Sequence, residues 1–281
     1  QKVLWKKNYY SKSEKKKNPK LTFARKNENL IVVDDVAKFY LVNINTGELV
    51  WSKVNDYPFN SQIKIFKDKF FVIDYKNIFR CFNLKDGSEC WNFKTEDTLM
   101  MSGSKYSIII ENETVIFNNS VGDITAIDIP TGSMIWQIPT QSSRISNETY
   151  IFRNSKLVSD GNSIFLSNNK NEFFSISLKT GTINWTNKIS SSLTPVLLDN
   201  LIFTISTDGF LFTIDKNQGN ILRVNDIYNL YKTKHRNKTK PVGFSVGKDK
   251  LYLSNNDGKI IVINLSSGNV IKTEKISGGL I

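Results

Sequence analysis

The sequence is poor in the residues from which reactive and metal-binding sites are built. Its 281 residues include two cysteines, Cys81 and Cys90, and one histidine, His235. A structural zinc site usually needs three or four such ligands, so no metal site is expected. A serine, histidine and aspartate triad would depend on His235, which lies in a lysine-rich run. The composition therefore predicts a protein that is not an enzyme and holds neither metal nor cofactor.

Proline and long apolar runs are also scarce. Six prolines are too few to form a proline-rich linker. No stretch approaches the roughly 20 consecutive apolar residues of a membrane-spanning helix. With 40% hydrophobic and 23% charged residues, the chain has enough apolar material to bury a core. Because the sequence begins with Gln1 rather than methionine, we expect that a signal peptide or lipid anchor has been removed.

The chain carries a net charge of +12, spread along its length with denser runs at Lys12–Lys20 and Lys232–Lys240. In the segment Asp226–Pro241, basic residues alternate with Tyr228 and Tyr231. This pattern fits binding to anionic lipid headgroups or to an acidic partner, and it equally fits a solvated loop. Because lysine is abundant throughout the chain, no binding to nucleic acid is expected.

One pattern recurs six times around a glycine. Each copy reads as a strand, a turn and a second strand, as in YLVNINTGELVW and TAIDIPTGSMIW. The intervals between successive glycines run from 38 to 49 residues, the size of one four-stranded propeller blade. The six signature glycines are Gly47, Gly87, Gly132, Gly181, Gly219 and Gly268.

Other positions of the repeat also have a mechanical explanation. The glycine allows the positive φ of a tight turn, and a short polar residue four positions earlier braces that turn. Four positions after the first four glycines stand Trp51, Trp91, Trp136 and Trp185. We expect each tryptophan to lie between neighbouring blades. Arg223 and Lys272 take this position in the last two repeats, where we expect weaker joints.

Further apolar segments precede each hairpin and supply two more strands. The sequence thus predicts an all-β fold, a single β-propeller domain over residues 1–281 built from four-stranded antiparallel blades. A helix is expected only around Asp226–Tyr231. The six complete blades are expected at about 20–54, 60–95, 98–138, 150–188, 192–226 and 241–275.

The two ends of the chain resemble parts of one further blade. Trp5 stands in the same sequence context as the hairpin tryptophans, so residues 1–8 are expected to form the outer strand of that blade. Residues 277–281 would begin its innermost strand. Six complete repeats plus a partial closing seventh blade are therefore expected, and this closure removes open sheet edges. The alternative is closure with six blades.

The two cysteines flank the turn at Asp86 and Gly87. A simple hairpin places Cys81 opposite Asn92, and Cys90 opposite Asn83. The two sulfur atoms would then lie diagonally on one face, and a slip of one residue would separate them. A disulfide is not favoured.

The repeat resembles the PQQ-type propeller repeat, with the pattern A-x-D-x-x-T-G-x-x-x-W, and Thr125–Trp136 is its clearest copy. Within that group the chain resembles the BamB family, through its compact size, its N-terminal tryptophan and the run Met134–Gln137. The resemblance implies a monomeric scaffold in the periplasm, anchored to the outer membrane by an N-terminal lipid. Such a scaffold aids the assembly of β-barrel proteins. BamB proteins usually have eight blades, one more than expected here.

The resemblance also implies a protein partner of the BamA type, bound through loops between blades. The family's Leu-x-Leu-Arg run corresponds here to Leu99, Met100, Met101 and Ser102, without the arginine. The alternative is that Leu99–Met101 form the innermost strand of the third blade. The acidic positions of a second loop fall near Asn154 and Ser155, so a different partner surface is expected.

Two other classes share this repeat. Quinoprotein dehydrogenases bind pyrroloquinoline quinone and calcium beneath a pair of adjacent cysteines, which this chain lacks. The chain is also about half the length that such enzymes need. A periplasmic sensory or protein-interaction propeller is equally compatible with the repeat.

Overall fold

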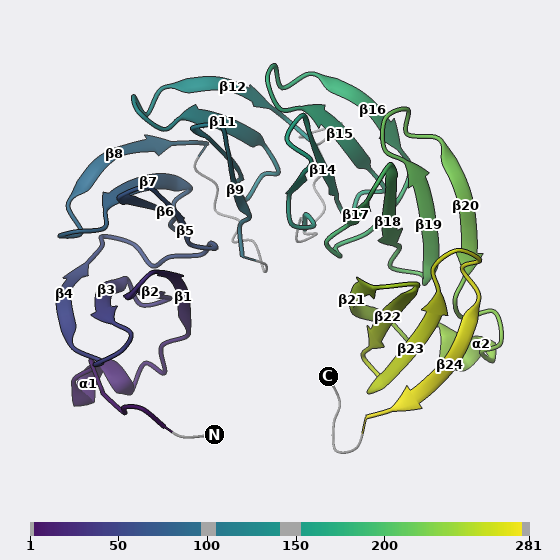
Figure 1. The fold of residues 1–281 in the computed structure, drawn as a ribbon, viewed down its shortest axis with the longest axis horizontal. Helices are drawn as coiled ribbons and strands as arrows, with labels where there is room; N and C mark the ends of the chain where they lie inside the picture. Colours follow the sequence, from purple (N-terminus) through teal and green to yellow (C-terminus); the bar gives the residue numbers. More distant parts are fainter. Residues whose placement is uncertain (1–2, 97–104, 141–152, 277–281) are drawn as a thin grey trace. The chain divides into compact units, whose positions relative to one another are not determined.

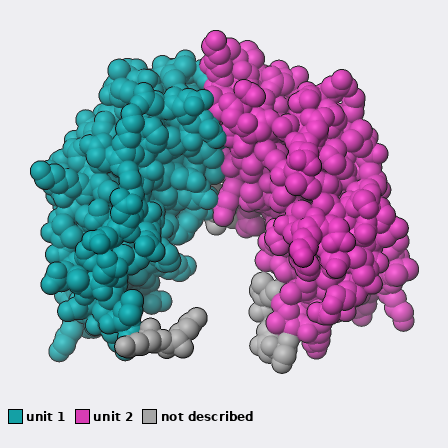
Figure 2. Space-filling view, in the orientation of Figure 1, with its two compact units in different colours: residues 1–151 teal, residues 152–281 magenta. Residues whose placement is uncertain are grey.

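The computed structural model describes residues 3–96, 105–140 and 153–276. Across these ranges the strands form six four-stranded antiparallel sheets. The chain divides into two compact units, residues 1–151 and 152–281 (Figure 2), each of which contains three sheets.

The first unit contains three sheets whose strands follow chain order from one edge to the other. The strands of the first sheet are β1 (Leu21–Lys26), β2 (Asn29–Asp34), β3 (Lys38–Asn43) and β4 (Leu49–Val54). Those of the second are β5 (Lys64–Phe66), β6 (Lys69–Ile73), β7 (Ile78–Asn83) and β8 (Glu89–Lys94). Those of the third are β9 (Ile108–Glu111), β10 (Thr114–Asn118), β11 (Ile124–Asp128) and β12 (Met134–Ile138).

The second unit repeats this arrangement. The strands of its first sheet are β13 (Val158–Ser159), β14 (Ser163–Ser167), β15 (Phe173–Ser177) and β16 (Ile183–Asn187). Those of the next are β17 (Val196–Leu198), β18 (Leu201–Ile205), β19 (Phe210–Asp215) and β20 (Ile221–Asp226). Those of the last are β21 (Pro241–Gly247), β22 (Lys250–Asn255), β23 (Lys259–Asn264) and β24 (Val270–Lys275).

Within the first unit the sheets pack as propeller blades. The short inner strand β5 contacts both β1 and β9, and β4, β8 and β12 lie at the opposite edges of their sheets (Figure 1). Apolar side chains fill the space between sheets. Phe39 and Leu41 of the first sheet, for example, cluster with Phe70 and Phe82 of the second. The predicted fold class, an all-β propeller of four-stranded blades with six complete repeats, is confirmed.

The signature tryptophan of one blade packs against the signature glycine of the next blade along the chain. The Trp91 ring lies against Gly132, where an added Cβ would stand 2.7 Å from the ring. Its Nε1 donates a hydrogen bond to the carbonyl oxygen of Ile129 at 3.0 Å. Each such glycine therefore has a second reason to lack a side chain, besides its positive φ. The same pairing joins Trp5 to Gly47, Trp51 to Gly87 and Trp185 to Gly219.

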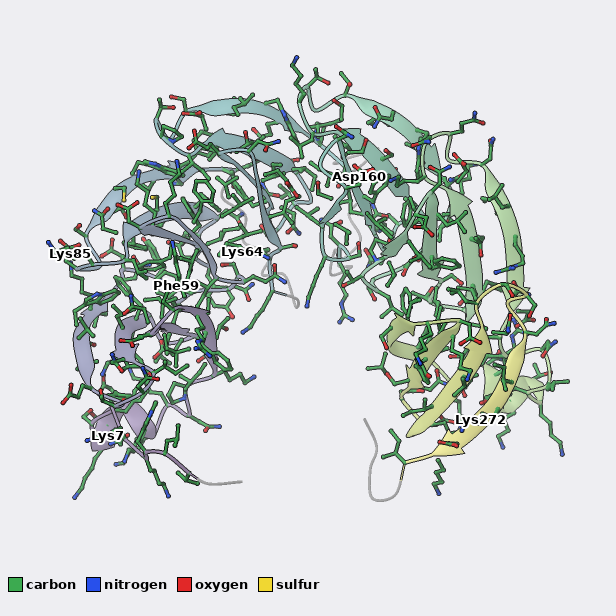
Figure 3. All side chains as sticks on the ribbon, in the orientation of Figure 1. Lys7, Phe59, Lys64, Lys85, Asp160 and Lys272 are labelled. Carbon is green, nitrogen blue, oxygen red and sulfur yellow. The ribbon has the colours of Figure 1, made fainter. Side chains whose placement is uncertain are left out.

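The last two repeats make different contacts. Arg223 donates hydrogen bonds to the carbonyl oxygens of Leu265 and Ser266, so it reaches the turn that a tryptophan would cover. Lys272 on β24 (Figure 3) pairs instead with Glu274 two residues further along the same strand, at 2.6 Å. Arg223 thus reproduces the joint by hydrogen bonding, whereas the ion pair of Lys272 stays within its own strand.

A β-bulge interrupts the outer strand of every described sheet and corrects the expected pairing of the cysteines. Cys81 pairs with Trp91, Phe82 pairs with Glu89, and Cys90 is the extra residue between them. The predicted opposition of Cys81 to Asn92 and of Cys90 to Asn83 is therefore wrong, because a simple hairpin register omits the bulge. The bulged residues are Val50, Cys90, Ile135, Asn184, Leu222 and Ile271.

Both cysteines are free thiols in very different surroundings. Cys81 is fully buried, and burial raises the pKa of its thiol far above the ordinary value, with the neighbouring Cys90 adding to the rise. Cys90 is only half-buried and donates to Asn83 Oδ1 at 3.3 Å. Because the thiolate is the reactive form, Cys81 should be inert in the folded protein.

We therefore expect Ellman's reagent to label one thiol in the native protein and two in denaturant. Peptide mapping should place the native label on Cys90. In a Cys90→Ser variant the native protein should give no fast reaction. Equal labelling of the two native thiols would contradict the buried position of Cys81.

In the described ranges, two short helices lie outside the blades. Helix α1 (Lys12–Lys15) begins at Ser11 in the first lysine-rich run, and helix α2 (Thr233–Arg236) lies in the second. The helix expected around Asp226–Tyr231 is not formed there, because Ile227 and Tyr228 are buried against the last two sheets. The described residues contain no helix long and apolar enough to cross a bilayer.

Candidate interaction surface

A second column of buried polar residues repeats with the blades, and the sequence analysis did not identify it. These residues stand 13 positions before each signature glycine. Asp74, for example, accepts hydrogen bonds from the backbone N–H groups of Lys76 and Ile78 and closes the turn between β6 and β7. The signal in the sequence is a short polar residue at or directly after the end of each second strand. The column consists of Asp34, Asp74, Asn119, Asn168, Ser206 and Asn255.

In the first unit Asn119 of this column belongs to a buried network that joins the second and third sheets. The Nδ2 atom of Asn77 donates to the carbonyl oxygen of Glu96 at 2.9 Å and to Ser120 Oγ at 2.7 Å. Asn119 Nδ2 donates to Thr95 Oγ1 at 3.3 Å. All of these side chains except Glu96 are buried, so their polar atoms need protein partners. The network therefore fixes the backbone where the chain leaves β8.

The chain leaves β12 from an equally fixed point. Thr140 is buried, and its hydroxyl donates to the carbonyl oxygen of Gly122 at 2.5 Å. Thr140 and Glu96 are the last described residues before 141–152 and 97–104, respectively. Both connections between blades therefore start from rigid positions on the same pair of sheets.

A cleft of about 320 Å³ opens beside these two positions. The described residues that line it are Glu96, Asp123, Gln137 and Pro139, and we call it the Glu96 cleft. Asp123 is buried and accepts a hydrogen bond from Gln137 Nε2 at 3.3 Å, whereas the other three residues are exposed. The cleft thus presents two carboxylates and one amide on a rigid floor. This chemistry suits a polar or basic segment of a partner better than an apolar ligand.

The predicted partner-binding residues fall in two places. Leu99, Met100 and Met101 lie outside the described residues. The innermost strand of their blade is β9, at Ile108–Glu111. Asn154 is half-buried, and its backbone bridges to Asn168.

Ser155 is only 2% exposed and is bonded within its own blade. Its Oγ accepts from the backbone N–H of Ser167 at 3.0 Å and donates to the carbonyl oxygen of Lys156 at 3.1 Å. Ser61 makes the same pair of bonds, to Ile73 and Gln62, in the second sheet. Ser155 is therefore part of the repeat, which argues against the predicted contact with a partner.

The N-terminal segment covers the first sheet on the face away from the second sheet. The Trp5 indole takes the signature position on Gly47, although residues 3–11 form no strand. Tyr9 and Tyr10 pack against Tyr40, with ring centroids 5.2 and 6.0 Å away. This segment therefore occupies the place that the outer strand of a preceding blade would take.

Glu14 holds the N-terminal segment in place. Its carboxylate accepts from the backbone N–H of Ser11 at 2.6 Å and pairs with Lys38 Nζ at 2.9 Å. The hydrogen bond from Ser11 and the one from Lys38 lower the pKa of Glu14 to about 2. Lys38 in turn donates to the carbonyl oxygen of Tyr9 at 2.6 Å.

Removing this charge should loosen the segment. Because the folded pKa lies below the unfolded value of about 4.3, the stabilisation is complete above that pH and is lost as pH falls through about 2. Hydrogen exchange should show weaker protection of residues 5–16 in Glu14→Gln than in the wild type at neutral pH. The difference should vanish near pH 2. The exposed Glu48→Gln serves as the control, and equal protection in all three proteins would contradict the assignment.

The basic segment between the last two sheets is docked and not freely solvated. Tyr228 is fully buried and Tyr231 is half-buried, so the Tyr228 ring is not available to a ligand. Apolar packing against Leu251 and Leu253 explains the difference. His235 stacks on Tyr231 at 4.7 Å and lies 3.4 Å from Asp257. Among the described residues, no group of three or more histidine, cysteine or acidic side chains is placed to hold a metal ion.

Comparisons with known proteins agree with this architecture. The family described as outer membrane protein assembly factor BamB matches residues 2–225. An uncharacterised protein of Rickettsia conorii is 20% identical over 221 residues, which cover 72% of this chain. The chain matches 49% of that relative, about half of its length.

Solved structures share the fold at low identity. The crystal structure of BamB from Moraxella catarrhalis superposes with a TM-score of 0.74 at 18% identity, covering 92% of this chain and 77% of that one. The C-terminal WD40 domain of Sif2 superposes with a TM-score of 0.69 at 14% identity, covering 97% and 75%. The computationally designed Ika8 protein gives 0.68 at 13% identity, covering 92% and 75%.

Proposed function

The chain belongs to the family of outer membrane protein assembly factor BamB, and from this premise we propose that it is a non-enzymatic scaffold that aids β-barrel assembly. It would do so on the periplasmic side of the outer membrane, by binding a subunit of the assembly machinery. The observation that carries the proposal is the Glu96 cleft. This cleft lies where two connections between blades leave a rigid polar network.

The polarity of the cleft indicates how a partner would bind. Glu96 and Asp123 bring two carboxylates to one side of a site whose floor is already hydrogen-bonded. A partner segment with polar or basic side chains would fit this polar lining better than an apolar segment would. Because the floor is preorganised, little ordering of the scaffold would be needed on binding.

Pull-down and surface-binding measurements with the soluble domains of the barrel-assembly subunit test the proposal. Replacing Glu96 and Gln137 by lysine reverses the polarity of the cleft and should weaken binding about 10-fold or more, since like charges oppose at close range. A matched control, Asn45→Lys with Glu48→Lys, makes the same change of charge on an exposed turn of the first sheet and should bind normally.

Two results would count against the proposal. Failure of the wild-type protein to bind would exclude the scaffold role with this subunit. Equal loss in the control variant would exclude the Glu96 cleft as the contact. Addition of pyrroloquinoline quinone and calcium with a redox dye tests the non-enzymatic part, and we expect no dye reduction.

A further inference from the structure

The segment 227–240 forms a distinct surface in the second unit. It connects β20 to β21 and is longer than 55–63 and 188–195, the two other connections between sheets that are described throughout. We call it the β20–β21 insertion.

The root of the insertion is fixed to both adjoining sheets. Ile227 and Tyr228 belong to the cluster of apolar side chains between these sheets, and Tyr228 Oη donates to Asn255 Oδ1 at 2.7 Å. The Tyr228 ring lies directly on Gly209, where an added Cβ would collide with it. Because of these contacts the insertion is held in one position.

Several charges of the insertion are already used in holding it. Arg236 pairs with Asp226 at 2.6 Å and lies over the Phe210 ring at 5.4 Å. Asp257 is engaged by Lys259 at 2.8 Å as well as by His235. The nearby carboxylates therefore face cations that belong to the fold.

Three lysines remain on the outer side. Lys232, Lys234 and Lys238 are exposed, and none of them forms an ion pair with a described residue. Lys240 lies beside them, with Asp208 at 3.9 Å in a solvent-exposed pair. Exposed pairs of this kind contribute little, so the outer side of the insertion has a positive potential.

One large apolar side chain accompanies these lysines. Leu230 is 89% exposed, the highest value for any large hydrophobic side chain in the described part of the chain. It precedes Lys232 by two residues and follows the buried anchor Tyr228 by two. Segments that bind a lipid interface combine apolar side chains that insert with basic side chains that meet the headgroups, and Leu230 together with these lysines offers both.

We propose that the β20–β21 insertion docks on an anionic lipid bilayer. Leu230 would enter the interface, while Lys232, Lys234 and Lys238 would lie among the headgroups. A protein partner would call for a wider apolar centre or for an arginine free to bind it. Leu230 is the one exposed large hydrophobic side chain of the insertion, and Arg236 is already paired with Asp226. An anionic membrane needs only positive charge and a side chain to insert.

Vesicle flotation gives a direct test on the full chain. Vesicles of phosphatidylglycerol and phosphatidylcholine at equal parts should bind the protein at low salt, and vesicles of pure phosphatidylcholine should not. Replacing all three lysines by glutamine should weaken binding about 100-fold, from about fivefold for each lysine. Leu230→Ser should weaken it about 10-fold.

The control variant changes the same amount of charge elsewhere. Lys12, Lys15 and Lys16 are exposed residues of the N-terminal segment, and their replacement by glutamine should lower binding by less than threefold. Circular dichroism and the melting temperature should be unchanged in all variants, since the altered side chains are exposed.

Three outcomes would overturn the proposal. One is a lack of wild-type binding to the anionic vesicles, including the case in which an acidic peptide binds instead. Another is an equal loss in the N-terminal control, which would indicate general attraction to the basic chain. The third is unchanged binding of Leu230→Ser. Because the Glu96 cleft lies in the other unit, loss of partner binding and loss of vesicle binding are separable.

Discussion

Replacing Trp91 by alanine lowers the free energy of unfolding by about 3–5 kcal/mol, the largest loss that we expect from a single apolar side chain. Trp91 lies within 5.9 Å of both the Phe71 and Phe79 rings, measured between centroids. Its loss removes this packing, the hydrogen bond to Ile129 and the cover of Gly132. Urea unfolding followed by circular dichroism measures the change.

The repeat supplies its own control for this experiment. Lys272 stands at the equivalent position of the last sheet, and the pair that it forms with Glu274 is more than half exposed. Lys272→Ala should change the free energy of unfolding by less than about 0.5 kcal/mol. Similar effects of the two substitutions would show that the tryptophan does not bind the blades together.

Replacing Arg80 by methionine should be equally damaging, for an electrostatic reason. Arg80 Nε pairs with Asp74 Oδ2 at 3.0 Å, and Arg80 Nη1 pairs with Glu89 Oε2 at 2.6 Å. Burial alone would lower the pKa of Arg80, but its hydrogen bonds to Glu89 and Asp74 outweigh burial and raise that pKa. Methionine keeps much of the volume and leaves the Asp74 carboxylate, which is 0% exposed, without its cation.

An uncompensated buried charge typically costs about 3–5 kcal/mol. Thermal and urea unfolding of Arg80→Met should show this loss. The double variant Arg80→Met with Asp74→Asn should recover part of it, because asparagine can still accept from Lys76 and Ile78 without carrying a charge. No recovery in the double variant would show that the loss arises from packing.

The fold was largely predictable because its repeat is local. Each hairpin needs a glycine with positive φ and a polar residue such as Asn43 or Asp215 that bonds to the turn, and both are visible in a short window. The bulge at Cys90 was not predictable from alternation alone, since it moves the register by one residue without changing the composition. The capping residues Ser11 and Glu14 were visible in the sequence and were overlooked within a lysine-rich run.

The candidate surface was less predictable, because it depends on contacts between blades. The network of Asn77, Thr95 and Ser120 joins residues far apart in the sequence. The column of polar residues to which Asn119 belongs repeats with the blades, but it lies outside the glycine-centred hairpins that define the repeat. Ser155 is a different case. The resemblance placed it in a partner-binding loop, but its side chain is buried in the structure.

Tyr228 gives the second unit an unexpected thermodynamic linkage. Its ring fills the joint between the last two sheets, where Arg223 replaces tryptophan, and the same residue is the root of the β20–β21 insertion. A ligand that binds only the folded insertion would stabilise this joint by mass action. The melting temperature of the second unit would then rise with the concentration of that ligand. Tyr228 would thus couple ligand binding at the insertion to the packing of the last two sheets.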